Sequence, residues 1–236
     1  MRVLITGSAG AIGTAVIEGM KDRYELRGFD LQPTATLDDF AVGDVADYDA
    51  VLAAAEGMDA IVHLGGVPRA GSPWEDVLQS NIRGTRNVLE AARVNGVRRV
   101  AYASRGGVLP ASIYPRSVQR NADMKPFGET EYSVSKVFGE AIGWMYSQVH
   151  GIEFVAVRIG NFKRDRPQPE HPHHLSHGDA ARVFEAAVAH PGVKFEIVFD
   201  VSDSNWPLYD VEHGRKAIGY YPQDISEVSQ EVMDAG

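Results

Sequence analysis

The sequence predicts an α/β fold with a doubly wound parallel sheet, and three observations lead to this prediction. The chain has 236 residues with 44% hydrophobic content, enough for one domain with a substantial core. Short runs rich in β-branched residues alternate with longer helical stretches. A glycine-rich turn joins the first expected strand to the first expected helix. Strands that alternate with helices in this way form parallel sheets, because each helix leads the chain back across the sheet.

The expected elements follow one another closely along the chain. Strands are expected at 3–6, 26–29, 60–63, 97–103, 154–158 and 195–199. Helices are expected at 15–20, 48–55, 77–92, 132–148 and 178–189. Two irregular stretches, 105–130 and 161–176, are typical of loops that border a site. We expect residues 1–236 to form a single domain, with a small C-terminal substrate-binding part mainly in 161–236.

Composition excludes several classes of function. The formal charge of −9 argues against a broad surface for nucleic acid or anionic membranes. The chain has no cysteine and therefore no disulfide, thiolate nucleophile or cysteine-based metal site. No secretory leader pattern and no apolar run of membrane-spanning length is present. We expect a cytoplasmic protein that binds neither nucleic acid nor a membrane.

The glycine-rich turn predicts a dinucleotide site. It places Gly7, Gly10 and Gly13 directly after the first strand, with Ala11 and Ile12 between the last two glycines. Glycines allow a sharp turn, a close approach of the backbone to a diphosphate and tight packing of the helix on the strand. The turn therefore indicates a Rossmann-type fold, and a simple tight β–α turn is the alternative.

The acidic residue after the second strand predicts which dinucleotide is bound. Asp30 lies at the end of this strand, where a carboxylate accepts hydrogen bonds from both hydroxyls of the adenosine ribose. The same carboxylate repels a 2′-phosphate, and no arginine follows it directly. The cofactor expected is NAD. Asp44 and Val45 are further candidates beside the adenine, although Gly43 and Asp44 also form a plausible turn.

Tyr132 and Lys136 form the candidate catalytic pair. They lie four residues apart at the start of a predicted helix, and this spacing places them on one face. A nearby ammonium stabilises a phenolate and turns tyrosine into a usable general base. An incidental Tyr and Lys on a surface helix is the alternative. The position of the pair after the glycine-rich turn favours catalysis.

These motifs together resemble the extended short-chain dehydrogenase/reductase family, also called the NAD-dependent epimerase/dehydratase family. Within it the chain is most similar to uronate dehydrogenases, which oxidise the anomeric carbon of a free hexuronic acid with NAD. The resemblance covers nearly the whole chain. It rests on ITGSAGAIG (5–13), VHLGG (62–66), NIRGTRNVLEAAR (81–93), VAYAS (100–104), YSVSKVFGE (132–140), VRIGN (157–161) and AIGYYPQD (217–224).

The resemblance implies roles for particular residues. Tyr132 takes the hydroxyl proton, Lys136 also holds the nicotinamide ribose, and Asn81 supports the site. Further contacts with NAD are implied at Leu64, Gly65, Gly66, Asn81 and Ile159.

The chain departs from the family pattern at the end of the fifth strand. A Ser or Thr there orients the substrate oxygen in such enzymes, and uronate dehydrogenases usually carry two consecutive serines. This chain has Ser104 followed by Arg105, and the catalytic serine of the family aligns with Arg105. Ser104 is the nearest candidate for the hydroxyl, with Ser112 as a second.

The substrate contacts are expected from the loops. Arg105, Asn161, Arg164, Arg166 and His174 are candidates. Arg164 and Arg166 fit a carboxylate or phosphate unless they are solvated loop charges. One or two of the histidines at positions 171, 173, 174 and 177 are expected in the substrate pocket. A metal site is not expected, because no acidic partner has suitable spacing. Trp206 and Tyr209 either stack on a sugar or pack in the core.

The expected function is oxidation of a sugar or sugar-acid hydroxyl, with a small-molecule substrate. A nucleotide-sugar epimerase or dehydratase is the first alternative, although fewer than eighty residues follow VRIGN, which leaves little room for a nucleotide-holding lobe. A non-catalytic NAD-binding protein is the second, and it would be expected to lack the Tyr or the Lys. The helices at 77–92 and 132–148 could pair in a homodimer or a larger homo-oligomer.

Overall fold

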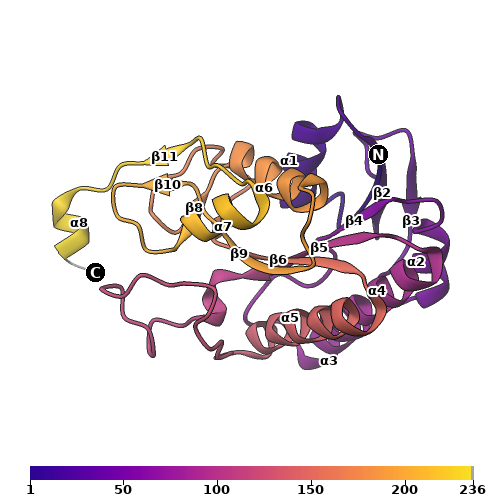
Figure 1. Cartoon of the computed structure of the whole chain (residues 1–236), viewed down its shortest axis with the longest axis horizontal. Coiled ribbons are helices and arrows are strands. Elements are labelled where there is room, and N and C mark those ends of the chain that lie inside the picture. Colours follow the sequence, from indigo (N-terminus) through magenta and orange to yellow (C-terminus); the bar gives the residue numbers. More distant parts are fainter. Residues whose placement is uncertain (235–236) are drawn as a thin grey trace.

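The computed structural model describes residues 1–234 and confirms the predicted α/β fold (Figure 1). Its central strands are β1 (Arg2–Thr6), β2 (Glu25–Asp30), β3 (Phe40–Val42), β4 (Ala60–His63), β5 (Arg99–Arg105), β6 (Glu153–Ile159) and β9 (Phe195–Asp200). They form a seven-stranded sheet in the order β3-β2-β1-β4-β5-β6-β9. Every neighbouring pair is parallel. Residues 235–236 of the expected domain lie outside the described residues.

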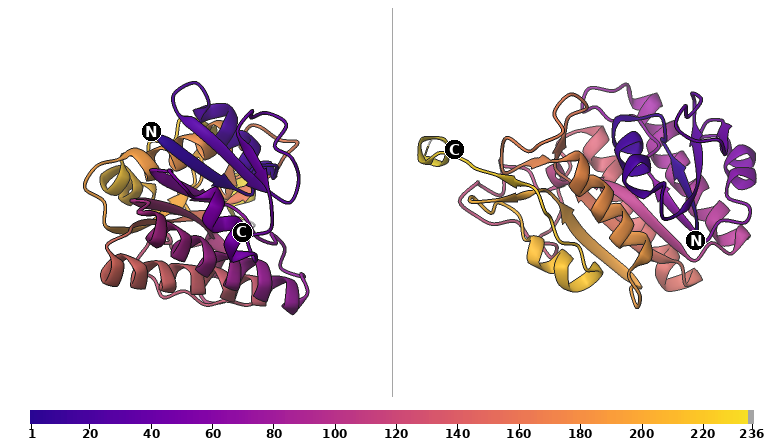
Figure 2. Two further views of the ribbon diagram at one scale, coloured as in Figure 1. Left: turned by 90° about the vertical axis from the view of Figure 1, so that its right-hand side faces the viewer. Right: turned by 90° about the horizontal axis from the view of Figure 1, so that it is seen from above.

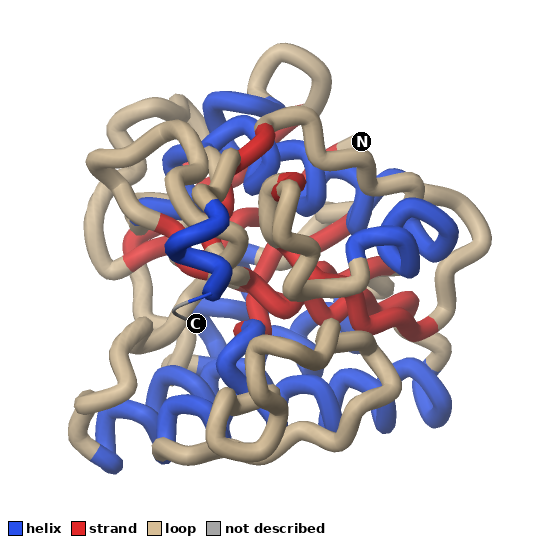
Figure 3. The backbone as a smooth tube through the Cα atoms, turned by 90° about the vertical axis from the view of Figure 1, so that its left-hand side faces the viewer, coloured by secondary structure: helices blue, strands red, loops and turns tan. Residues whose placement is uncertain are grey.

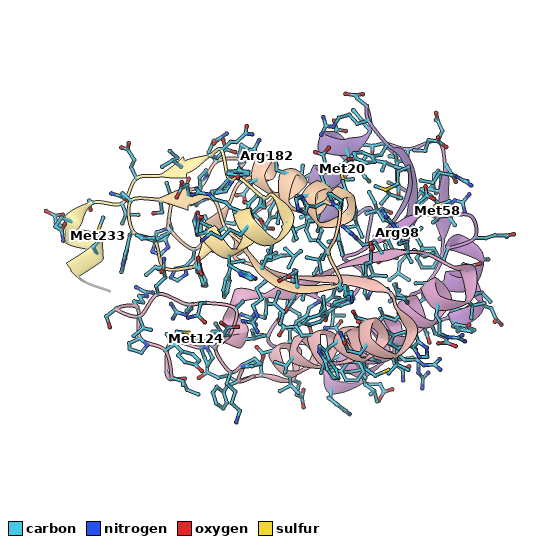
Figure 4. All side chains as sticks on the ribbon, in the orientation of Figure 1. Met20, Met58, Arg98, Met124, Arg182 and Met233 are labelled. Carbon is cyan, nitrogen blue, oxygen red and sulfur yellow. The ribbon has the colours of Figure 1, made fainter. Side chains whose placement is uncertain are left out.

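Helices cover both faces of the sheet (Figure 2). One face carries α1 (Ala11–Met20) and α6 (His177–Ala189), and the other carries α2 (Tyr48–Ala54), α4 (Gly84–Asn95) and α5 (Glu131–His150). Each face of the sheet has its own apolar core. Met20 belongs to the core under α1 and α6, and Met58 belongs to the core under α2, α4 and α5; both are labelled in Figure 4. Because the strands are covered on both faces, all four residues of β4 are buried, and its apolar residues 60–62 show no polar alternation. Within residues 1–234, none of the helices combines the length and the apolar character that crossing a membrane requires.

The winding of the chain creates a crevice between β1 and β4. The chain begins at β1, moves outward through β2 and β3, and returns to β4 on the other side of β1. The connections after β1 and β4 therefore leave the sheet in opposite directions. In parallel α/β sheets, ligands bind at the carboxyl ends of the strands beside such a crevice.

The helix expected at 77–92 is longer and less regular than predicted. α3 (Trp74–Asp76) leads into a π-helical segment, η1 (Val77–Arg83), and α4 follows without a break. Gly96 ends the helix with a φ of 68°, which glycine adopts without strain. The apolar pattern continues through the π-helical turn, so periodicity alone does not reveal it. Such turns often occur at functional sites, and this one carries Asn81.

Loops and short elements gather at the carboxyl ends of β5, β6 and β9 (Figure 3). The short elements are η2 (Gly106–Val108), β7 (Asn161–Phe162), β8 (His174–Leu175), β10 (Asp203–Ser204), α7 (Val211–Ile218), β11 (Ile225–Ser226) and α8 (Gln230–Asp234). A backbone bridge between Arg120 and Tyr209 joins the 105–130 loop to the C-terminal part. A third apolar cluster, which includes Val108, Phe199 and Leu208, fills the space between them.

A buried carboxyl group lies at the end of β9. Both side-chain oxygens of Asp200 are buried without a hydrogen-bond partner among the described residues. The Tyr220 hydroxyl donates to the Val201 carbonyl at 3.1 Å, and its proximity to Asp200 only partly offsets the effect of burial on the pKa of that carboxyl. Burial, reinforced by the negative charge of Asp179, raises the pKa of Asp200 well above 3.8. The folded protein therefore favours the protonated form of this carboxyl group.

We expect Asp200→Asn to stabilise the protein increasingly as pH rises. Below pH 3.8 the carboxyl is protonated in both the folded and unfolded states and costs nothing. Above that pH the unfolded state ionises while the folded state does not, so the wild type loses up to about 1.4 kcal/mol of stability per pH unit until the raised pKa is reached. Urea unfolding at pH 4, 6 and 8 measures this trend. The exposed Asp38→Asn variant is the control, and equal pH dependence in wild type and Asp200→Asn would contradict the expectation.

Candidate active site

A cavity of about 910 Å³ opens at the carboxyl ends of the central strands. It brings together most of the residues that the sequence singled out. Those expected to contact NAD that line it are Gly7, Gly10, Ala11, Ile12, Gly13, Asp30, Asp44, Val45, Leu64, Gly65, Gly66, Tyr132, Lys136 and Ile159. Of the substrate candidates, Ser104, Arg105 and Asn161 line it.

The glycine-rich turn forms one end of this cavity. Gly7 has a φ of 73°, and a Cβ there would lie 2.8 Å from the backbone nitrogen of Gly65. A Cβ on Gly13 would lie 2.3 Å from the Gly7 carbonyl oxygen, so the helix can pack this closely only with glycine. α1 begins at Ala11 with no side-chain cap and no acidic residue in its first turn. Its first N–H groups and its positive dipole end therefore suit a diphosphate.

The carboxylate of Asp30 lies beside this turn at the end of β2. Its Oδ2 accepts a hydrogen bond from the Ala9 N–H at 3.1 Å, and its Oδ1 accepts one from the Gln32 N–H at 3.2 Å. A carboxylate held in this way has lone pairs left for ribose hydroxyls. Asp44 lies further along the cavity and accepts a hydrogen bond from the Ala46 N–H at 2.9 Å. The residues present fit the adenosine half of NAD.

Asn81 lies behind the cavity wall and does not line it. It is 1% exposed, and its Oδ1 accepts the Val67 N–H at 2.8 Å. Its Nδ2 donates to Ser135 Oγ at 3.0 Å. Asn81 therefore joins the loop after β4 to α5 behind the cavity wall, as its expected supporting role requires.

Tyr132 and Lys136 face the cavity from the first turns of α5. This helix starts after Thr130, whose hydroxyl caps it by accepting the Ser133 N–H at 3.1 Å. Lys136 Nζ lies 5.7 Å from the centroid of the Tyr132 ring. Burial, with a smaller contribution from the Arg105 charge, lowers the pKa of Lys136 to about 8. Burial raises the pKa of Tyr132, and Arg105 opposes that rise.

His63 supports the pair from β4 as a neutral side chain. Burial and the nearby Lys136 charge lower the pKa of His63 to about 3. Its ring nitrogens lie 2.7 Å from Thr6 Oγ1 and 3.1 Å from Thr85 Oγ1. The imidazole therefore joins β1, β4 and α4 without adding charge to the site.

The hydroxyl of Ser104 is occupied by a structural hydrogen bond. It donates to Glu140 Oε1 at 2.6 Å, and Glu140 in turn pairs with Arg158. Although Ser104 lines the cavity, it is only 2% exposed. Side chains alternate along a strand, so Ser104 and Arg105 leave β5 on opposite sides. This geometry does not favour the expected role of Ser104 as the hydroxyl that orients the substrate.

Four other expected substrate contacts lie outside the cavity. Ser112 is exposed and donates to Glu129, and the guanidinium of Arg166 pairs with Glu170. Arg164 is exposed, and its Nη2 lies 3.4 Å from the Ala9 carbonyl oxygen. His174 accepts the Glu170 N–H at 3.1 Å. Ser112 belongs to the 105–130 loop and the other three to the 161–176 loop, and periodicity could not tell which loop side chains face inward.

Two aromatic residues, His173 and Tyr209, line the cavity although these four side chains do not. His173 Nδ1 lies 3.0 Å from the Tyr209 hydroxyl, and both residues line the cavity. Burial is the largest effect that lowers the pKa of His173 to about 4, so this ring is neutral. Of the histidine cluster in the sequence, His173 lines the cavity and His174 does not, because neighbouring histidines face different ways. Arg69 also borders the cavity.

The described residues hold no group of three or more His, Asp or Glu side chains placed to bind a metal ion. Beside Tyr132 the cavity is instead lined by two cations, Arg105 and Lys136, and the titratable side chains of His173 and Tyr209 also line it. The arrangement combines a glycine-rich dinucleotide turn with a tyrosine hydroxyl beside two cations. Proton abstraction coupled to redox chemistry is what such a site can perform.

Comparisons with known proteins agree with this geometry. The family model for the NAD dependent epimerase/dehydratase family matches residues 3–198. An NAD-dependent glucose-6-phosphate dehydrogenase from Haloferax volcanii is 34% identical, with 95% of this chain and 94% of the relative covered. A uronate dehydrogenase from Pseudomonas putida is also 34% identical, with 99% and 88% covered.

Solved structures give the same result. A glucuronic acid dehydrogenase from Chromohalobacter salexigens matches with a TM-score of 0.87 and 30% identity, over 99% of this chain and 88% of that chain. A uronate dehydrogenase from Agrobacterium tumefaciens matches with a TM-score of 0.85 and 33% identity, over 99% and 87%. These structural matches and the family match together confirm the resemblance to the epimerase/dehydratase family that the motifs indicated. The chain belongs to the NAD-dependent epimerase/dehydratase family.

Proposed function

We propose that the protein is an NAD-dependent dehydrogenase that oxidises a hydroxyl group of a sugar or sugar acid, at the anomeric carbon. The observation that carries the proposal is that Tyr132 and Lys136 share one cavity with the glycine-rich turn and Asp30. Relatives of similar length support the substrate class, since their names specify uronate, glucose 6-phosphate and L-arabinose. Cytoplasmic location and self-association stay predictions from the sequence.

The residues of the chain have distinct tasks in this reaction. When bound, NAD would supply the acceptor for the hydride that the substrate carbon loses as its alcohol is oxidised to a carbonyl. The phenolate of Tyr132 takes the hydroxyl proton, and the Lys136 ammonium stabilises the phenolate before that transfer. The buried position of Lys136 strengthens its interaction with the phenolate, because few waters screen it. The first turn of α1 and the Asp30 carboxylate hold the cofactor in place.

An epimerase that acts on a nucleotide sugar is the second candidate. A UDP-glucose 4-epimerase from Mycolicibacterium smegmatis is 29% identical, but the match covers only 61% of that relative. An epimerase uses the same pair and returns the hydride to the product, so no net NADH forms. The better coverage of the dehydrogenases favours oxidation.

We expect purified protein to release NADH with NAD and a free sugar or sugar acid. The screen follows NADH absorbance with aldoses, hexuronic acids, phosphorylated aldoses and nucleotide sugars. Conversion of a nucleotide sugar without net NADH, together with no NADH from any free sugar, would reject the dehydrogenase in favour of the epimerase. Reversal with NADH and the isolated product checks that the product is the oxidised sugar.

We expect Tyr132→Phe to lower kcat by about 10²-fold to 10⁴-fold while NAD affinity changes little. The change removes the group that takes the proton and leaves the ring in place. Steady-state kinetics and titration with NAD measure the two effects. Tyr221→Phe is a matched control, because Tyr221 is 60% exposed and does not line the cavity. A kcat close to that of wild type would remove Tyr132 from the mechanism.

We expect Asp30→Ala to weaken NAD binding and to narrow the preference for NAD over NADP by about tenfold. The variant loses charge-assisted hydrogen bonds to the ribose and the repulsion of a 2′-phosphate. The ratio of kcat/KM values for the two cofactors measures the preference. Asp38→Ala, in an exposed position outside the cavity, is the control. An unchanged ratio in Asp30→Ala would show that Asp30 does not contact the ribose.

A further inference from the structure

The site lacks a free hydroxyl at the end of β5, and a guanidinium occupies that place. Ser104 donates its hydroxyl to Glu140 and is buried. Arg105 follows it, lines the cavity and lies on the side of the strand opposite to Ser104. Its backbone is extended, with φ −146° and ψ 145°, so the alternation of the strand continues through this residue. The inference below rests on the function proposed above.

A hydrogen bond attaches the Arg105 side chain to α5. Its Nη1 donates to Ser133 Oγ at 3.0 Å. Ser133 is 2% exposed, and its Oγ lies 3.0 Å from the Oγ1 of Thr130, the residue that caps α5. The guanidinium is thereby attached to the first turn of the helix, next in sequence to Tyr132.

Gly107 leaves the space that this arrangement needs. A Cβ on Gly107 would lie 2.4 Å from Nη2 and 2.7 Å from both Cζ and Nε of Arg105. The Arg105 side chain therefore folds back over the glycine, and its Cζ lies 5.1 Å from the centroid of the Tyr132 ring. An arginine over an aromatic ring at this distance makes a favourable cation–π contact.

Two cations and one neutral phenol face Tyr132. The cations are Arg105 from β5 and Lys136 from α5, and the phenol is Tyr102, also from β5. Lys136 has a pKa of about 8 and loses its charge as pH rises past that value. A guanidinium keeps its charge throughout the range in which proteins are folded. The positive charge beside Tyr132 that persists above pH 8 is therefore that of Arg105.

We propose that Arg105 is a positioning residue for Tyr132, which substitutes a permanent positive charge for the missing hydroxyl at the end of β5. It holds the ring through the cation–π contact and the bond to Ser133, and it stabilises the phenolate. The phenolate oxygen then takes the proton of the substrate hydroxyl as in the reaction proposed above. Arg105 itself neither gains nor loses a proton.

The test compares wild type with four variants. Three of them change Arg105, and the fourth changes a control arginine. Arg105→Met removes the charge, Arg105→Lys keeps it without the fork of donors, and Arg105→Ser installs a hydroxyl. Arg93→Met is the control, because Arg93 pairs with Glu90 on α4 and does not line the cavity. The melting temperature of each variant confirms that it is folded.

The first readout is the pH dependence of kcat/KM. Without the Arg105 charge the phenolate is less stable, so the acidic limb of the profile should move to higher pH by about one unit in Arg105→Met and Arg105→Ser. Below the limb, kcat/KM should fall about tenfold. Arg105→Lys should shift the limb less, and Arg93→Met should not shift it. An unchanged acidic limb in Arg105→Met or in Arg105→Ser would overturn the proposal.

The second readout needs no substrate. In protein labelled with ¹³C-lysine, the Lys136 resonance is assigned by its absence in Lys136→Met and titrated by NMR. Loss of the neighbouring charge should raise its midpoint above about 8 in Arg105→Met, with no change in Arg93→Met. An unchanged midpoint would show that the Arg105 charge does not act on the pair. Because this measurement is independent of turnover, it tests Arg105 even if the screen finds no substrate and the proposed dehydrogenase activity fails.

Discussion

A buried ion pair between Glu140 and Arg158 holds the catalytic helix on the sheet, and the geometry of the site depends on it. Arg158 donates to both oxygens of Glu140 at 2.9 Å, and Ser104 adds a third hydrogen bond. Breaking such a pair leaves an unpaired charge in the interior and costs about 3–5 kcal/mol. The helix can come this close because Gly139 and Gly143 have no Cβ: one would lie 2.2 Å from the ring of the residue opposite in each case. Residues of α5, β5 and β6 thus jointly fix where the helix lies along the sheet.

The charges of the cavity are separated along its length. The acidic residues that line it, Asp30 and Asp44, lie toward the adenosine end, and Arg105 and Lys136 lie at the reacting end. The chain as a whole carries a formal charge of −9, so the positive potential at the reacting end is local. His63 and His173 are neutral there because they are buried. The cavity therefore supplies acceptors for ribose hydroxyls at one end and stabilises a phenolate at the other.

Local sequence patterns predicted the parts of the site that lie close together in the chain. The turn from Gly7 to Gly13 and the Tyr132–Lys136 spacing each need only one strand end or one helix, and the structure brings both to the same cavity. The parallel arrangement of the sheet follows from the alternation of strands and helices. The hydrogen bond that occupies the Ser104 hydroxyl could not be predicted in this way. Its acceptor Glu140 lies 36 positions away, and the contact depends on the packing of α5. The choice between His173 and His174 depends likewise on how one loop folds.

The hydrogen bond between Asp30 and the Ala9 N–H makes the choice of cofactor part of the loop's own structure. The carboxylate that would accept the ribose hydroxyls also fixes the turn that would hold the diphosphate. The two contributions to affinity are therefore coupled and not additive. A descendant of this protein that changed Asp30 to admit NADP would also lose the hydrogen bond that Asp30 accepts from the turn.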